Sequence, residues 1–478
     1  MVSARISTAY YGGLMIFSRT LIFMTALFLV TRAPAGASEN SDLDFIPNAV
    51  QKESYIKEPF PERKQWGINF VEDEIAFSSI RGDLAVPVPV SQPDWQNRTS
   101  VDLNQTWKAT ELISLRLNDR FDVLEESDLN FPSQGSSHNN FQEGFGSFEI
   151  LSGTYLEAGR INLKNGIALG FNPTDYFKTR SAVSQATADP SALREVRMGA
   201  LMVRIQEIGE SGALSLSYSP KVTSASAIPL SPGPSLDPLF GQTNATDRIL
   251  LIFSHNLLDL YPQALIYYEN GQSRLGLNVS HVFGKSVVGY AEWSGGNQTN
   301  LSTRAVNFGK QTGALTQDAL PLPQIDSGEF FQNDASLGFS WANSRKITVN
   351  VEYHYHQGGF NKTDLDNWFA LGRENSLVIS ELWYVRLYAS DQEEPMMQEE
   401  LFFRADWQDA IITNLNLNGF AMISPYDGSA FIQMSAGYYL SKDWTLQVLL
   451  GAAVGSGDTE YGSLPKSMTT AFQGVRYF

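Results

Sequence analysis

The ten residues Ile347–His356 read ITVNVEYHYH, and their side chains alternate between two kinds. The apolar or aromatic positions are Ile347, Val349, Val351, Tyr353 and Tyr355. The polar positions between them are Thr348, Asn350, Glu352, His354 and His356. Successive side chains of a β-strand point to opposite faces, so this period of two predicts a strand with one apolar and one polar face.

The same alternation recurs along most of the chain. It is clearest in residues 111–125, 214–219, 275–280, 336–341, 401–407 and 432–440. Two architectures produce it. A soluble sandwich or solenoid turns its apolar face to a core, whereas a transmembrane barrel turns that face to lipid and its polar face to a lumen.

Three features favour the barrel. The alternating segments run to about ten residues, the length of a tilted membrane strand, whereas an average strand has about five or six. Aromatic residues lie near the segment ends, as an interfacial girdle requires. Tight turns are expected at 209–211, 270–272, 343–346, 425–429 and 441–443, and long polar loops at 221–247, 294–333, 358–379 and 454–468. We therefore predict an all-β fold, a transmembrane antiparallel β-barrel with short periplasmic turns and long extracellular loops.

The number of strands follows only roughly from the pattern. Nineteen candidate segments lie near 66–80, 100–107, 111–124, 144–151, 154–164, 195–207, 213–220, 248–255, 262–270, 273–283, 286–293, 335–342, 346–356, 380–389, 400–407, 413–423, 430–440, 443–453 and 469–478. Bacterial single-chain barrels usually have an even number of strands, and the earliest candidates are the weakest. We predict about 16 strands, within 14–18, formed by residues 66–478.

The N-terminal region predicts export. Leu21–Val30 reads LIFMTALFLV, with Arg19 before it and the small residues Ala35–Ala37 after it, which is the pattern of a secretory signal peptide. Ten residues span only about 15 Å as a helix, too short for a membrane anchor. We expect residues 1–37 to be a cleaved signal peptide and 38–65 a periplasmic leader, with the chain exported through the periplasm to the outer membrane.

Composition narrows the classes of partner. The net charge of −17 disfavours a nucleic-acid partner, because phosphate contacts need clustered Lys and Arg. The absence of cysteine excludes a disulfide scaffold and the common structural zinc sites. No cofactor is expected.

A signal peptide, serial amphipathic strands and the terminal Phe478 together resemble the Gram-negative outer-membrane porin-like β-barrel family. The resemblance implies a passive channel, with Phe478 as part of the C-terminal signal that the barrel-assembly machinery reads. It implies outer-membrane lipids and small hydrophilic solutes as the other partners, and leaves a homo-oligomer open.

The segment from Gly159 to Gly199 is more distinctive. It contains Gly159-Arg160 and, after Gly170-Phe171, the run Asn172-Pro173-Thr174-Asp175, similar to a Gly-Arg strand and Asn-Pro-x-Asp loop of several porin-like families, some of them in exopolysaccharide export. One interpretation is a loop folded into the lumen, which brings charged residues to a constriction. Those residues are Arg160, Asp175, Arg194 and Arg197. The alternative is turn chemistry alone, with a helix over 190–207.

The polar faces of other strands supply further candidates. The full set of pore-lining or constriction residues predicted is Arg116, Arg120, Arg160, Asp175, Arg194, Arg197, Glu352, His354, Arg404 and Asp406. His354 and His356 share a strand face with Glu352, which allows a metal site or a catalytic base as well as plain lumen lining. The acidic run 391–394 is expected to be a solvated loop.

No catalytic motif is present in the sequence, so we predict no enzyme. The predicted function is an outer-membrane porin-like channel for passive diffusion of small hydrophilic solutes or ions. The alternatives are an outer-membrane component of polysaccharide or lipid export and, less favoured, an outer-membrane hydrolase.

Overall fold

The computed structural model describes residues 67–478 except 90–91, 129–130, 184–186, 210, 229–235, 258–259, 261 and 326–327. The predicted signal peptide and leader, residues 1–65, lie outside the described residues. The rest of the chain forms one closed sheet of 18 strands.

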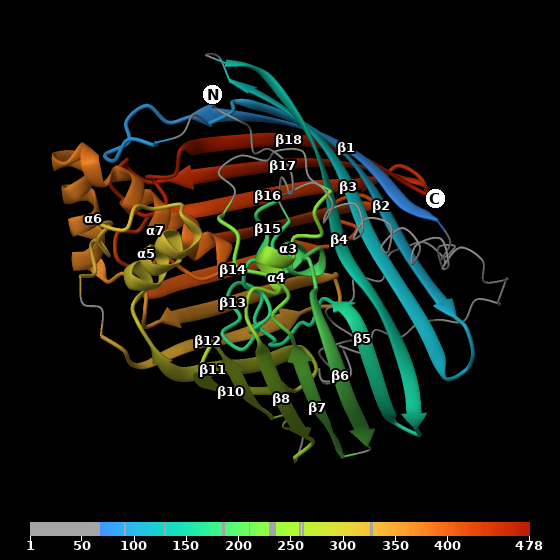
Figure 1. Ribbon diagram of the computed structural model, residues 1–478. Helices are drawn as coiled ribbons and strands as arrows, with labels where there is room; N and C mark the ends of the chain where they lie inside the picture. The colour runs from blue at the N-terminus through green and yellow to red at the C-terminus, as the bar shows by residue number, and fades with distance from the viewer. Residues whose placement is uncertain are drawn as a thin grey trace, which may run out of the picture.

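Each strand pairs antiparallel with its neighbours in sequence, and β1 also pairs with β18, which closes the barrel (Figure 1). The strands are β1 Ile68–Ile80, β2 Trp95–Lys108, β3 Ile113–Asp128, β4 Phe131–Leu151, β5 Thr154–Ile161, β6 Ala200–Gly209, β7 Gly212–Ser219, β8 Arg248–His255, β9 Gln263–Glu269, β10 Gln272–Phe283, β11 Val287–Gln298, β12 Phe330–Ala342, β13 Ile347–His356, β14 Glu399–Trp407, β15 Leu415–Ile423, β16 Ala430–Tyr439, β17 Trp444–Val454 and β18 Lys466–Tyr477. The predicted antiparallel β-barrel is confirmed.

The barrel has 18 strands, which is the upper limit of the predicted range of 14–18 rather than the favoured count of about 16. Eighteen of the nineteen candidate segments are strands, including the weak early ones, and the exception is 380–389, which lies in helix α7, Ile379–Asp391. There the buried residues Leu382, Val385 and Tyr388 are three apart, which is helical spacing, although the same stretch also alternates. The helix expected as an alternative over 190–207 is limited to α3, Pro190–Glu195, and β6 begins at Ala200.

Long loops gather at one end of the barrel, at which β1 ends and β2 begins. The long connections β5–β6, β7–β8, β11–β12 and β13–β14 all lie there, whereas the C-terminus lies at the other end (Figure 1). Two of the predicted tight turns, 270–272 and 425–429, were placed on the wrong side, because they join β9–β10 and β15–β16 at the long-loop end. Short connections therefore occur at both ends.

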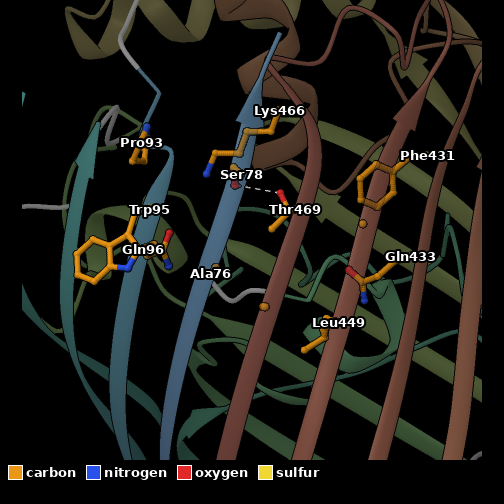
Figure 2. A pocket seen from close by; sticks show the side chains of 12 residues that line it. Ala76, Ser78, Pro93, Trp95, Gln96, Phe431, Gln433, Leu449, Lys466 and Thr469 are labelled. Carbon is orange, nitrogen blue, oxygen red and sulfur yellow. Dashed lines mark hydrogen bonds between the residues drawn. The ribbon is translucent and has the colours of Figure 1, made fainter. Parts of the chain in front are cut away.

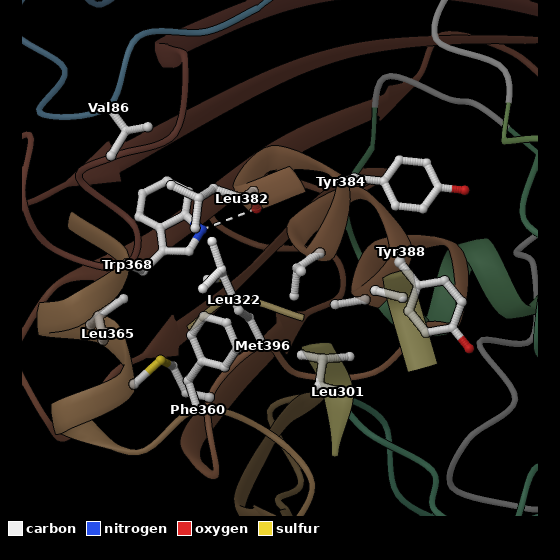
Figure 3. Packing of buried hydrophobic residues seen from close by; sticks show 14 of the residues in the cluster. Val86, Leu301, Leu322, Phe360, Leu365, Trp368, Leu382, Tyr384, Tyr388 and Met396 are labelled. Atoms are coloured by element: carbon white, nitrogen blue, oxygen red, sulfur yellow. Dashed lines mark hydrogen bonds between the residues drawn. The ribbon is translucent and has the colours of Figure 1, made fainter. Parts of the chain in front are cut away.

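Helices at the long-loop end form a cap with its own hydrophobic core (Figures 1 and 3). The helices of the described residues are α3, α4 Phe240–Thr243, α5 Leu301–Thr312, α6 Lys362–Glu374, the 3₁₀ turn η2 Ser376–Val378 and α7. Trp368 of α6 is fully buried in this core and donates its indole N–H to Leu382 O at 3.0 Å. Val86 and Ile228, from two other loops, pack into the same core, so the cap ties several loops together. Among the described residues, no helix is long and apolar enough to cross a membrane.

Candidate functional site: the barrel interior

The two faces of the strands differ as the alternation predicts. On β7, Leu214 and Leu216 point outward and are 45% and 44% exposed, whereas Ser215 and Ser217 point inward and are buried. On β13, Tyr353 is exposed on the outer face, and its neighbours Glu352 and His354 are buried on the inner face. The outside is therefore apolar and the inside polar.

Residues 162–199, here called the inner loop, connect β5 to β6, and those that the structure describes lie against the inner wall. Two wall carboxylates hold the start of this loop. Glu292 of β11 accepts the backbone N–H groups of Ile167 and, at 2.5 Å, Ala168. Glu352 accepts those of Leu169 and Gly170 at 2.7 and 2.9 Å. Four consecutive backbone N–H groups thus donate to two carboxylates. A hydrogen bond to a charged group contributes about 1.5–3 kcal/mol to stability.

Two glycines let the backbone approach this closely. A Cβ at Gly166 would lie 2.5 Å from a Glu292 oxygen, and the residue has φ +88°, a conformation that L side chains rarely adopt. A Cβ at Gly170 would lie 2.5 Å from the His354 ring and 2.8 Å from Phe402. The glycines of the distinctive sequence segment are therefore needed for contact with the wall.

The run Asn172–Asp175 continues the contact. The Thr174 hydroxyl donates to Asn278 of β10 at 2.8 Å, and Ser336 of β12 donates to Phe171 O at 2.5 Å. Tyr176 stacks on Tyr267 of β9 with ring centroids 4.4 Å apart. The segment that resembles a porin-family loop does fold into the lumen, as one of the two interpretations predicted.

The second half of the inner loop contacts the nearby strands β14 and β16 of the same wall. Asp189, which also caps α3, pairs with Arg404 of β14, and Arg404 pairs with Asp406 at 2.8 Å. Ala188 donates its N–H to Gln433 of β16 at 2.8 Å. The loop, which starts from β5, is thereby fastened along the wall from β9 to β16.

Buried ion pairs neutralise the loop's own charges. Asp175 lies 2.8 Å from Arg197 and 3.4 Å from Arg194, and Arg197 also lies 3.3 Å from Glu393. Burial disfavours the charged Arg197 guanidinium, but Asp175 and Glu393 outweigh it and raise its pKa. Burial also disfavours the charged form of the Glu393 carboxyl group, and this raises its pKa. The expectation that the run 391–394 is a solvated loop was wrong, because it packs against the inner loop.

Arg160 serves as a brace between loops. Its guanidinium donates to Gly199 O at 2.8 Å and to Pro238 O at 2.5 Å. It also lies between the rings of Phe141 and Phe240, at 5.6 and 5.4 Å from their centroids. These contacts join the inner loop to the β7–β8 loop.

The predicted residues therefore form separate groups. The structure brings together Asp175, Arg194 and Arg197, and likewise Arg404 with Asp406. On β3, Arg120 is buried against Asp122 and Glu72, at 2.9 and 3.3 Å, and Arg116 lies 3.1 Å from Glu143 of β4. Arg160 belongs to none of these groups. A shared constriction role for the ten residues stays a prediction.

His354 lies between two carboxylates. Its ring nitrogens are 2.8 Å from Glu352 and 2.9 Å from Glu400, and His356 is 2.8 Å from Asp334. Three of these groups face inward on β13, as the spacing predicted. In the described part of the chain, no group of three or more His, Cys, Asp or Glu side chains is arranged to hold a metal ion.

One part of the wall makes no hydrogen bond to the described residues of the inner loop. Within the described residues, no hydrogen bond joins the loop to β17, β18 or β1. A cavity of about 210 Å³ lies against these strands (Figure 2). Its lining is Ala76, Ser78, Pro93, Trp95, Gln96, Phe431, Gln433, Leu449, Gly451, Lys466, Thr469 and Ala471. The described lumen is thus divided into a filled side and a side with free volume.

Sequence reasoning missed three anchors of the inner loop: Glu292, Asp189 and Gln433. Glu292 had a local signal, because it is the only charged residue in β11, VVGYAEWSGGNQ, and occupies an inward position. Asp189 and Gln433 had none, since nothing in the sequence tells which distant strands the loop reaches.

Comparisons with known proteins find similar solved barrel structures but no relative of high sequence identity. No family model matches the chain, and no curated protein matches it. Among solved structures, it is similar to OccK8 (OprE) of Pseudomonas aeruginosa, with a TM-score of 0.46 and 9% identity over 86% of this chain and 97% of that one. It is also similar to mutants of the Rhodopseudomonas blastica porin, one of them with a TM-score of 0.37 and 8% identity over 86% and 98% of the two chains. Because these values are low, the barrel architecture rests on the strand order and faces of this chain itself.

Proposed function

We propose that this chain is an outer-membrane channel through which small hydrophilic solutes or ions diffuse passively. The observation that carries the proposal is the closed 18-stranded barrel with an apolar outer face and a polar inner face. Barrels of about 16–18 strands are wide enough to leave an aqueous channel. An inner loop fastened inside the lumen narrows the path of solutes through such a channel, and passive diffusion along that path involves no chemical reaction.

The outer face supports the membrane location. Large apolar side chains such as Leu337 and Met434 are 62% and 60% exposed. Side chains of this kind recur on the outer face of strand after strand, and an apolar surface of that extent is an aggregation hazard in water but suits lipid. In the usual orientation the long-loop end with its helical cap is extracellular and the C-terminal end is periplasmic.

We propose that Phe478 takes part in recognition by the barrel-assembly machinery. Phe478 is half exposed, and its N–H donates to Asn69 O at 3.2 Å next to the seam between β18 and β1. The Arg476 guanidinium lies 4.8 Å from the Phe478 ring centroid. An exposed aromatic at the closing seam is available to a partner during assembly.

Reconstitution into planar lipid bilayers tests the proposal. In cells we expect the protein to fractionate with outer membranes. The purified protein should shift its gel mobility on heating and give stepwise ion conductance in KCl. Protein that inserts as a heat-modifiable barrel but never conducts would overturn the channel, and recovery as a detergent-free soluble monomer would overturn the membrane location.

A further inference from the structure

The cavity on the open side of the lumen has the chemistry of a binding site. Side chains from strands distant in sequence line it: Ser78 of β1, Gln96 of β2, Phe431 and Gln433 of β16, and Thr469 of β18 (Figure 2). They supply two amides, two hydroxyls and one aromatic ring. Amides and hydroxyls can both donate and accept hydrogen bonds, so they match ligands that do the same.

One of these polar groups is available to a ligand. Among the described residues, the Gln96 amide makes no hydrogen bond, whereas the Gln433 amide is engaged by Thr187 and Ala188 of the inner loop. The Ser78 and Thr469 hydroxyls are 3.1 Å apart, and either can be the donor. Hydroxyls retain further acceptor capacity after one hydrogen bond. The ring of Phe431 adds an apolar surface beside them (Figure 2).

The β15–β18 side of the cavity is almost free of charge, whereas on the β1–β2 side Glu74 and Arg98 face inward and are buried, two residues from Ala76 and Gln96. Strands β15, β16 and β17 contain no Asp, Glu, Lys or Arg, and β18 has only Lys466 and Arg476 at its ends. The inward positions of β17 and β18 include Gln447, Gly451, Thr469 and Gln473. Arg476 lies over the rings of Trp444 and Phe478 at the far end, so Lys466 is the one charged side chain in the cavity lining. Taking a charged solute out of water is costly unless it is fully paired, and the β15–β18 side of the cavity offers little pairing.

We propose that this cavity is a binding subsite for neutral polyhydroxylated solutes, that is, uncharged sugars or polyols. Such molecules present hydroxyls for the Gln96, Ser78 and Thr469 side chains and C–H faces for the Phe431 ring. A pocket with a few polar groups and an apolar surface is the usual form of a small-molecule site. The inference rests on the proposed channel function, because the subsite lies on the open side of the lumen.

Current block by glucose in single bilayer channels tests the subsite, with sodium glucuronate as the matched anionic probe. We expect glucose to reduce or interrupt the KCl current of the wild type in a saturable way. Gln96→Ala should raise the half-blocking glucose concentration about threefold to tenfold, the effect of one lost hydrogen bond. Gln473→Ala is the control, because Gln473 lies on the same wall but four residues along β18 from Thr469, or about 13 Å.

The outcomes separate the two proposals. If the wild type conducts but glucose gives no saturable block, or Gln96→Ala and Gln473→Ala change the block equally, the subsite is wrong and the channel stands. If glucuronate blocks better than glucose and Lys466→Gln abolishes that preference, the site takes anions and the neutral class is wrong. If no variant conducts, the channel itself fails. Phe431→Leu provides a second test, since it should weaken glucose block while the basal conductance persists.

Discussion

At Gly170 the inner loop touches the barrel wall through its backbone alone. A Cβ there would meet the His354 ring and Phe402, both buried and confined. Gly170→Ala should therefore displace the loop or the wall and destabilise the protein by about 1–3 kcal/mol, the usual effect of overpacking. Gly437→Ala is the matched control, because nothing lies within 4 Å of the position of its Cβ.

The measurement is the heating temperature at which the gel mobility of each variant shifts, together with trypsin sensitivity of the inner loop. We expect Gly170→Ala to unfold at lower temperature and to be cleaved faster than the wild type, and Gly437→Ala to match the wild type. Equal behaviour of the two variants would mean that the loop does not dock as described.

The buried carboxyl group of Glu460 should make the stability of the protein depend on pH. Glu460 lies in the β17–β18 loop, where burial, followed by the nearby Glu400 carboxylate, raises its pKa from 4.5 to about 8. Between these values the unfolded chain has lost a proton that the folded chain keeps, so stability falls as pH rises through this window. Glu460→Gln should flatten that fall.

Melting of the wild type at pH 5 and pH 8.5 checks this, with Glu374→Gln as a control on an exposed position of α6. The wild type and the control should lose stability at the higher pH, and Glu460→Gln should lose less. A wild type whose stability does not decline between the two pH values would contradict the assignment.

At the scale of the elements, the sequence predicted strands well because their signal is local. A membrane strand shows its two faces in every pair of neighbouring residues, so eighteen candidate segments sufficed to place β1–β18. The helix α7 was mistaken for a strand because Leu382, Tyr384 and Tyr388 alternate while Leu382, Val385 and Tyr388 follow helical spacing. A short apolar run can match both the strand period of two and helical spacing. Only the packing of the cap decides between a strand and a helix here.

Neighbouring positions on β17 test the assignment of faces. Val448 points outward near the middle of the strand, and Gln447 points inward on the uncharged wall. Val448→Arg would place a charge in lipid and should cost about 2–4 kcal/mol. Gln447→Arg should fold like the wild type and shift the reversal potential in a salt gradient toward anions, since a fixed charge beside a narrow aqueous path attracts counter-ions. Similar folding losses in both variants would contradict the face assignment.

At the scale of the whole molecule, the arrangement of the lumen was beyond sequence reasoning. The sequence left the segment around Gly170 open between an in-folded loop and turn chemistry alone, and gave no sign that its anchors lie on β11, β13, β14 and β16. Those contacts join residues more than a hundred positions apart, and no local pattern encodes which strands they reach. Asp175, Arg194 and Arg197 are paired with one another, and Arg160 donates to backbone carbonyls, because a loop that folds into a lumen buries its own polar groups and must satisfy them.

The division of the lumen into a filled and an open side is the central claim, and cysteine accessibility tests it most directly. The chain has no cysteine of its own, so single replacements are the only reactive thiols. Thr469→Cys lies in the cavity lining, whereas Ser336→Cys lies on the filled side beneath Phe171. A cationic methanethiosulfonate reagent added to single bilayer channels should reduce the current of Thr469→Cys and leave Ser336→Cys unchanged. Rapid modification of Ser336→Cys with no change at Thr469→Cys would show that solutes pass on the other side of the barrel.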